Sequence, residues 1–349
     1  MKAPFPYFGG KTKIGPLVWQ ALGQPKHYIE PFCGSCAVLL ARPHWQPGSY
    51  METVNDKDMH IANAWRAMQA DPDAVAKVCD WPVNHADLNA RRHVLDQRGE
   101  ELRARLIADP KAYDAEMAGY WIWCQCVWIG SGMTRPDSMP HLSHSGMGIH
   151  ALGPMPHLTD GGMGIHALGK RPHLTDGGKG IHALGQRPNA PDLTKDVREP
   201  YNTRIYEWFR KLSERLRYVR VVCGDWKRVC GGDWQDDQGV CGMFFDPPYG
   251  GETGRDPTIY SEENLTVAQE VADWCLERGD RKTYRIVLAG YYEEHERLLS
   301  LGWRVTRWKA NSGYANQGGD NQNRRREALF MSPHCLSPHD MPLFTVEER

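Results

Sequence analysis

The chain lacks any apolar run long enough to span a bilayer, and residues 1–6 lack the apolar stretch of a secretion signal. It also has almost no net charge, because 42 lysines and arginines are balanced by 43 aspartates and glutamates. That balance argues against a generally basic nucleic-acid coat, so any contact with nucleic acid must come from local patches. We therefore expect a soluble, cytoplasmic protein without membrane contacts.

A paired set of metal-binding cysteines is missing as well. The ten cysteines lie mostly in apolar or strand-like stretches, which indicates reduced thiols in a core. Cys33 and Cys36 have the spacing of a CxxC motif, but a zinc or redox site needs a second ligand pair or a thioredoxin-like context. Neither is evident, so the sequence predicts no metal requirement.

What the sequence does contain is a short apolar run, 240–245, that leads into Asp246-Pro247-Pro248-Tyr249. Because proline lacks the backbone donor that a central strand needs, the chain must turn there. A carboxylate, fixed carbonyls and an aromatic ring are thus held at the carboxyl end of a strand, where open α/β sheets bind ligands. The simpler interpretation is a proline turn with a solvated aspartate.

These groups suit chemistry on the exocyclic amine of a nucleobase. Such an amine is a poor nucleophile because its lone pair is delocalised into the ring, and two acceptors that bind both N–H groups can localise that pair. Asp246 and the carbonyl of Pro247 supply two acceptors. Tyr249 offers a face on which a base taken out of its duplex can stack.

The four-residue turn after an apolar strand resembles the catalytic motif of the adenine-specific DNA methyltransferases, and the order of motifs resembles their Dam-like branch, the D12 class. The resemblance covers about residues 4–64 and 200–331. It implies transfer of a methyl group from S-adenosylmethionine to adenine N6 in double-stranded DNA, with the target adenine flipped out and no covalent enzyme intermediate. Methylation of cytosine N4 or of RNA, or a DNA-binding relative without activity, are the alternatives.

Two early segments resemble the family's donor-binding motifs. The first is an aromatic-x-Gly-Gly-Lys sequence, and the second is an acid-Pro-Phe-x-Gly turn in which Cys36 replaces a second glycine. The donor-binding residues that this resemblance implies are Tyr7, Gly9, Gly10, Lys11, Glu30, Pro31, Phe32 and Gly34.

Three further acids follow predicted strands. Asp56 lies roughly 20 residues beyond the glycine turn, the place where such folds bind ribose hydroxyls. Asp58 is interpreted as a cap of the next helix. Asp225 can accept from the amine of the donor's adenine, or it is only a turn acid, and Asp246 also borders the donor.

The predicted fold is α/β, a Rossmann-like seven-stranded sheet of the class I methyltransferase type with an inserted, mainly helical and repeat-containing recognition domain. The expected strands lie near 27–30, 50–56, 218–223, 240–245, 285–290, 303–308 and 327–331. The catalytic domain is predicted to be discontinuous, 1–64 and 200–331, around an insert at 65–199 and before a tail at 332–349.

The insert is expected to be helical up to about residue 129 and then to contain three copies of a 16-residue unit at 139–186. The repeats are interpreted as an arm that grips DNA, with a passive expansion or a histidine metal module as alternatives. Predicted DNA contacts are Trp128 and Ser131 in an aromatic and glycine-rich segment and Arg324, Arg325 and Arg326 in a polar loop. The resemblance implies a bacterial cell or a phage-infected host, and the recognised site and the oligomeric state stay open.

Overall fold

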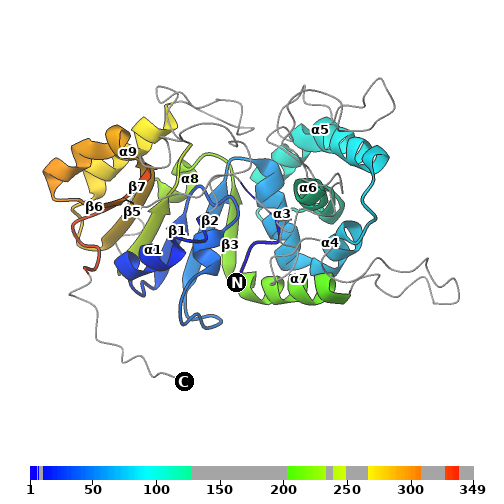
Figure 1. Ribbon diagram of the computed structural model, residues 1–349, viewed down its shortest axis with the longest axis horizontal. Coiled ribbons are helices and arrows are strands. Elements are labelled where there is room, and N and C mark those ends of the chain that lie inside the picture. The colour runs from blue at the N-terminus through cyan, green and yellow to red at the C-terminus, as the bar shows by residue number, and fades with distance from the viewer. Residues whose placement is uncertain are drawn as a thin grey trace, which may run out of the picture.

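The computed structural model describes residues 1–5, 7, 11–127, 203–232, 239–248, 266–307 and 327–337. Within them lies a mixed α/β fold around a seven-stranded sheet of order β3-β2-β1-β4-β5-β7-β6 (Figure 1). Only β7 runs antiparallel to its neighbours, β5 and β6. The strands are β1 (His27–Glu30), β2 (Met51–Asp56), β3 (Val219–Cys223), β4 (Cys241–Phe245), β5 (Tyr284–Tyr291), β6 (Arg304–Arg307) and β7 (Glu327–Met331). The predicted α/β class and seven-stranded sheet are confirmed.

The two central strands, β1 and β4, are buried along their whole length. They pair in parallel, with Ile29 opposite Met243. From this pair the strand order runs through β2 and β3 in one direction and through β5 in the other. The order therefore reverses between β1 and β4, and ligands of such sheets bind beyond the carboxyl ends of the strands at that point.

Helices cover both faces of the sheet. Successive strand residues point to opposite faces, and the central strands carry apolar side chains on both. On β4, Phe244 joins one hydrophobic cluster while Met243 and Phe245 join the other. The helices are α1 (Gly15–Leu22), α2 (Ala37–Leu40), α3 (Met59–Ala70), α4 (Pro72–Cys79), α5 (His85–Ala108), α6 (Ala115–Val127), α7 (Thr203–Leu216), α8 (Lys227–Cys230), α9 (Val267–Arg278) and α10 (Tyr292–His295), with a 3-10 helix, η7 (Glu296–Leu301).

The helices α3 to α7 group together beside the β3 edge of the sheet (Figure 1). Local sequence sets their starts: the side chains of Asp58, Asp71 and Asn84 accept backbone N–H bonds at the first turns of α3, α4 and α5. Asp58 is thus the helix cap that the sequence predicts. No helix in the described ranges is long and apolar enough to cross a membrane.

One hydrophobic cluster runs without a break from one face of the sheet into these helices, joining Val54 and Val221 to Trp65 and Trp121. The predicted boundary between residues 64 and 65 falls inside α3. The first residues of the predicted tail pack on the sheet, since the N–H of Ser332 donates to the carbonyl of Ile286. The 16-residue repeats and residues 338–349 lie outside the described residues, and the domain division stays a prediction.

Candidate active site

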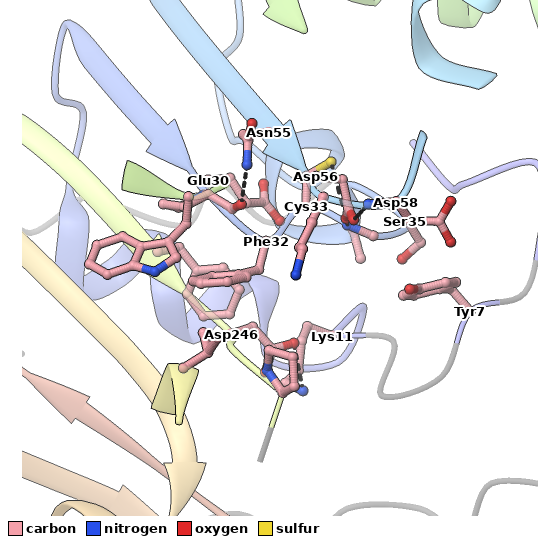
Figure 2. Close-up of a pocket in the computed structure, with 18 of the residues that line it drawn as sticks. Tyr7, Lys11, Glu30, Phe32, Cys33, Ser35, Asn55, Asp56, Asp58 and Asp246 are labelled. Atoms are coloured by element: carbon pink, nitrogen blue, oxygen red, sulfur yellow. Dashed lines mark hydrogen bonds and ion pairs between the residues drawn. The ribbon is translucent and has the colours of Figure 1, made fainter. Parts of the chain in front are cut away.

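A pocket opens at the carboxyl ends of β1, β2 and β4 (Figure 2). It spans about 900 Å³, including space open to solvent. Its lining joins five stretches that are far apart in the sequence and Val267 at the start of α9. The five stretches contribute Tyr7 and Lys11; Glu30 to Ser35 with Ala37; Asn55 to Asp58; Gly224, Asp225 and Trp226; and Phe244, Asp246 and Pro248.

The ion pair between Lys11 and Asp246 marks one side of the pocket (Figure 2). Asp246 is the first residue after β4, and Lys11 lies just before α1. The Nζ atom of Lys11 is 2.9 Å from Oδ2 of Asp246, and the side chains are 8% and 20% exposed. Such low exposure shields the pair from solvent and fixes the position of the carboxylate oxygens. Pro248, two residues on, also lines the pocket.

The turn at Gly34 and the ring of Tyr7 form another part of the lining. Gly34 has a φ of +44°, and a Cβ atom there would lie 2.7 Å from the Tyr7 ring. Glycine is therefore required both for the backbone conformation and for the close approach of the ring. The carbonyl of Gly34 accepts a 2.8 Å hydrogen bond from Nε1 of Trp65 on α3, and its N–H donates to Asp56.

Cys36 stands where the family motif has a second glycine, and it keeps the conformation that glycine favours. Its φ is +50°, in the left-handed region, and its N–H donates to the carbonyl of Cys33 over 2.7 Å. The side chain is completely buried in the cluster that also holds Val38 and Leu39. Packing of the thiol thus accompanies a backbone conformation that residues with a Cβ rarely adopt.

Glu30 ends β1 and is 2% exposed. Its Oε2 accepts from the hydroxyl of Tyr28 at 2.9 Å and from the N–H of Leu39 at 3.2 Å. Burial raises the pKa of Glu30 to about 8, and the nearby charge of Asp246 adds to this, whereas the two hydrogen bonds favour the ionised form. A carboxyl group of this kind changes charge near neutral pH.

Asp56 ends β2, the neighbouring strand. Its carboxylate accepts from the N–H of Gly34 at 2.9 Å and from the N–H of Asp58 at 3.0 Å. Burial raises the pKa of Asp56 to about 7, and the charge of Asp58 contributes in the same direction. The acid therefore fastens the Gly34 turn to the start of α3 while it lines the pocket.

Asn55 is a residue of this site that the sequence reasoning missed. It is completely buried, and its Nδ2 donates to the carbonyls of Pro31, at 2.9 Å, and Gly224, at 3.0 Å. One side chain thus holds the loops after β1 and β3 against β2 (Figure 2). The only signal in the sequence was an asparagine within the predicted strand, directly before Asp56.

The loop after β3 brings Asp225 and Trp226 to the pocket. Asp225 is exposed, and its Oδ1 accepts from the N–H of Lys227 at 2.9 Å, at the start of α8. Its contact with the donor's adenine stays a prediction. The ring of Trp226 lies 6.3 Å from that of Phe32 and 6.1 Å from that of Phe245. Phe32 and Trp226 therefore add apolar ring surface to the pocket lining beside its acids, and Phe245 packs behind Trp226.

The structure therefore brings together most of the residues predicted from the sequence. Those in the pocket lining are Tyr7, Lys11, Glu30, Pro31, Phe32, Gly34, Asp56, Asp225, Asp246 and Pro248. Pro247 is buried in the turn beside them. Lying outside the described residues are Gly9, Gly10, Trp128, Ser131, Tyr249, Arg324, Arg325 and Arg326.

The comparison with known families points to the same part of the chain. No curated protein matches the sequence. A family model described as D12 class N6 adenine-specific DNA methyltransferase matches residues 7–108, less than a third of the chain. The matched segment begins at Tyr7 and includes the Gly34 turn and Asp56, but it ends before Asp246. Over this segment the chain is similar to the D12 class of adenine-specific DNA methyltransferases.

Proposed function

We propose that the protein transfers a methyl group from S-adenosylmethionine to N6 of adenine in DNA. The observation that carries the proposal is the position of Asp246: it leaves the central strand β4 beside Lys11, in the same pocket as the Gly34 turn and Asp56. A carboxylate acceptor for the target amine and a nucleoside-type binding loop thus share one cavity. The family similarity over residues 7–108 supports the donor-binding half of this assignment.

The lining suits S-adenosylmethionine, which has a cationic sulfonium and amine, a ribose diol and a flat adenine. Glu30, Asp56 and Asp246 supply hydrogen-bond acceptors, and the Asp246 carboxylate beside Lys11 supplies negative charge. The absent Cβ of Gly34 leaves room for the backbone and the Tyr7 ring to approach closely. Bound there, the donor supplies an electrophilic methyl group.

The residues of the turn after β4 would act on the target base. Asp246 and the Pro247 carbonyl would accept hydrogen bonds from the two N–H groups of the amine, which directs its lone pair toward the methyl group. As the N–C bond forms, the sulfonium S–C bond would break to leave S-adenosylhomocysteine, and the methylated amine would lose one N–H proton to solvent. Lys11 holds the Asp246 carboxylate in place through their 2.9 Å contact. Preorganised acceptors of this kind need little rearrangement when charge develops on the amine. Tyr249 would stack on the flipped base.

The assignment of DNA contacts depends on the sequence alone. We propose that Trp128 and Ser131 face the target base, and that Arg324, Arg325 and Arg326 bind phosphates. With a formal net charge of −1, the chain needs such local contacts to hold a polyanion.

The test is methyl transfer to mixed-sequence double-stranded DNA from a donor labelled in its methyl group, followed by nucleoside analysis and mapping of the modified sites. We expect label in N6-methyladenine at a defined sequence. Label in N4-methylcytosine, or in RNA but not in DNA, would replace adenine in DNA as the substrate. A protein that binds DNA without transferring label would overturn the assignment as an enzyme.

A further inference from the structure

An aromatic contact between the start of the chain and the helices has no part in the proposed chemistry. Phe5 is 2% exposed and packs between two tryptophans. Its ring centroid lies 4.7 Å from that of Trp121 on α6, nearly edge-to-face at 78°, and 5.3 Å from that of Trp65 on α3. Such pairs have preferred geometries beyond simple burial, so the position of Phe5 is well defined.

Phe5 is connected to the Gly34 turn of the pocket in two ways, along the chain through Tyr7 and in space through Trp65. Tyr7, two residues along the chain, presses its ring against the Gly34 backbone. Trp65 reaches the same turn from the other direction, because its Nε1 donates to the carbonyl of Gly34 at 2.8 Å. Phe5 therefore packs against Trp65, which binds the Gly34 turn, and it lies two residues before Tyr7, which contacts the same turn.

The same segment is fixed to α6 a second time. The thiol of Cys126 lies 3.4 Å from the carbonyl of Pro4, and Cys126 is one residue before the end of α6. Figure 1 shows the start of the chain running toward α3 and its neighbours. The helix that leads directly into residues 128–202 is thus packed against the segment that supplies Tyr7 and Lys11 to the pocket.

From these contacts we propose that Phe5 is a positioning residue: it holds Tyr7 and the Gly34 turn at the spacing that the methyl donor requires, and it does so against α6. The inference rests on the proposed function, because it takes S-adenosylmethionine as the ligand of this pocket. Phe5 itself does not line the pocket. Its effect must therefore appear in the affinity for the donor while the lining side chains are unchanged.

The test compares wild type with Phe5→Leu, which keeps most of the buried volume but removes the ring, and with Phe5→Ala. Calorimetric titration with S-adenosylmethionine should show affinity reduced about 3- to 30-fold, with Phe5→Ala at the upper end. Thermal melts measured on the same samples confine the comparison to folded protein.

The matched control is Phe330→Leu, because Phe330 on β7 is equally buried but belongs to the other hydrophobic cluster. This variant should lose similar stability while its donor affinity stays within about twofold of wild type. Equal affinities in wild type and Phe5→Leu, or an equal loss in Phe330→Leu, would overturn the inference alone. Absence of donor binding in wild type would overturn the proposed function and the inference with it.

Discussion

At the scale of single residues, two acids of the pocket have pKa values that the fold raises, the buried Glu30 and the partly buried Asp56. Glu30 and Asp56 end neighbouring strands, and burial raises the pKa of the first to about 8 and of the second to about 7. Both side chains also accept backbone N–H bonds from the elements around them. Protonation of these two acids therefore affects the hydrogen bonds that hold the loops and helices around the pocket.

Glu30 makes the stability of the protein depend on pH. Because its pKa is higher in the folded protein than the usual 4.5, the folded state binds more protons between about pH 4.5 and 8. The free energy of unfolding must then fall as pH rises through this range, by at most about 1.4 kcal/mol per pH unit for one group. Glu30→Gln keeps an acceptor for Tyr28 and Leu39 but cannot ionise. Denaturant titrations from pH 5 to 8 should give a shallower decline for this variant, and an unchanged slope would exclude Glu30 as the source.

Asp56 should make donor binding depend on pH in the opposite direction. Ribose hydroxyls donate to a carboxylate more strongly than to a carboxylic acid, so affinity for S-adenosylmethionine should rise as pH increases through about 7. Asp56→Ala should weaken binding by about tenfold or more and remove this dependence. Calorimetry at pH 6 and 8 measures both effects, and the prediction fails if the folded variant binds like wild type at pH 8 or keeps the wild-type pH dependence.

At the scale of elements, the two helices that flank residues 128–202 in the sequence pack on the same helix. These helices, α6 and α7, both pack on α4. On α7, Arg210 binds Asp73 of α4 through two hydrogen bonds of 2.8 and 2.9 Å. Arg215, near the end of α7, is buried against Glu52 on β2. A change within the segment can therefore leave these anchors in place.

Deletion of residues 155–186, two whole repeat units, tests the role of the repeats. Shortening an inserted segment changes its closure entropy only slightly, so we expect a folded protein that still binds the methyl donor. DNA should bind less tightly and with a shallower dependence on salt, because phosphate contacts are lost. Unchanged DNA affinity and salt slope would favour a passive expansion, and loss of donor binding would place the repeats in the core.

At the scale of the whole molecule, the sequence predicts what is local and misses what joins distant segments. Apolar runs bounded by turns identify all seven strands, and the acid that ends β2, Asp56, is correctly placed in the pocket lining. The bonds of Asn55 could not be found in this way, since one of its partners, Gly224, is 169 residues away. The same holds for the bond from Trp65 to Gly34.

A second contact between distant segments is the one between Glu52 on β2 and the side chains of Arg42 and Arg215. All three residues are at most 6% exposed. From the sequence alone, a charged residue in a strand is expected to face solvent, because its buried partners cannot be identified. Arg42 follows α2 and Arg215 lies on α7, so the two partners are far apart in the sequence. Only the assembled fold shows that two arginines are available to one buried carboxylate.

The central claim is that Asp246 is the acceptor that activates the target amine. The most direct measurement is the single-turnover rate of methyl transfer to DNA, with saturating S-adenosylmethionine, in wild type, Asp246→Ala and Asp280→Ala. Asp280 is an exposed acid that does not line the pocket and serves as the control. We predict a fall of about 100-fold or more for Asp246→Ala, with the fold retained, and a wild-type rate for Asp280→Ala. A near-wild-type rate in folded Asp246→Ala would contradict the proposed mechanism.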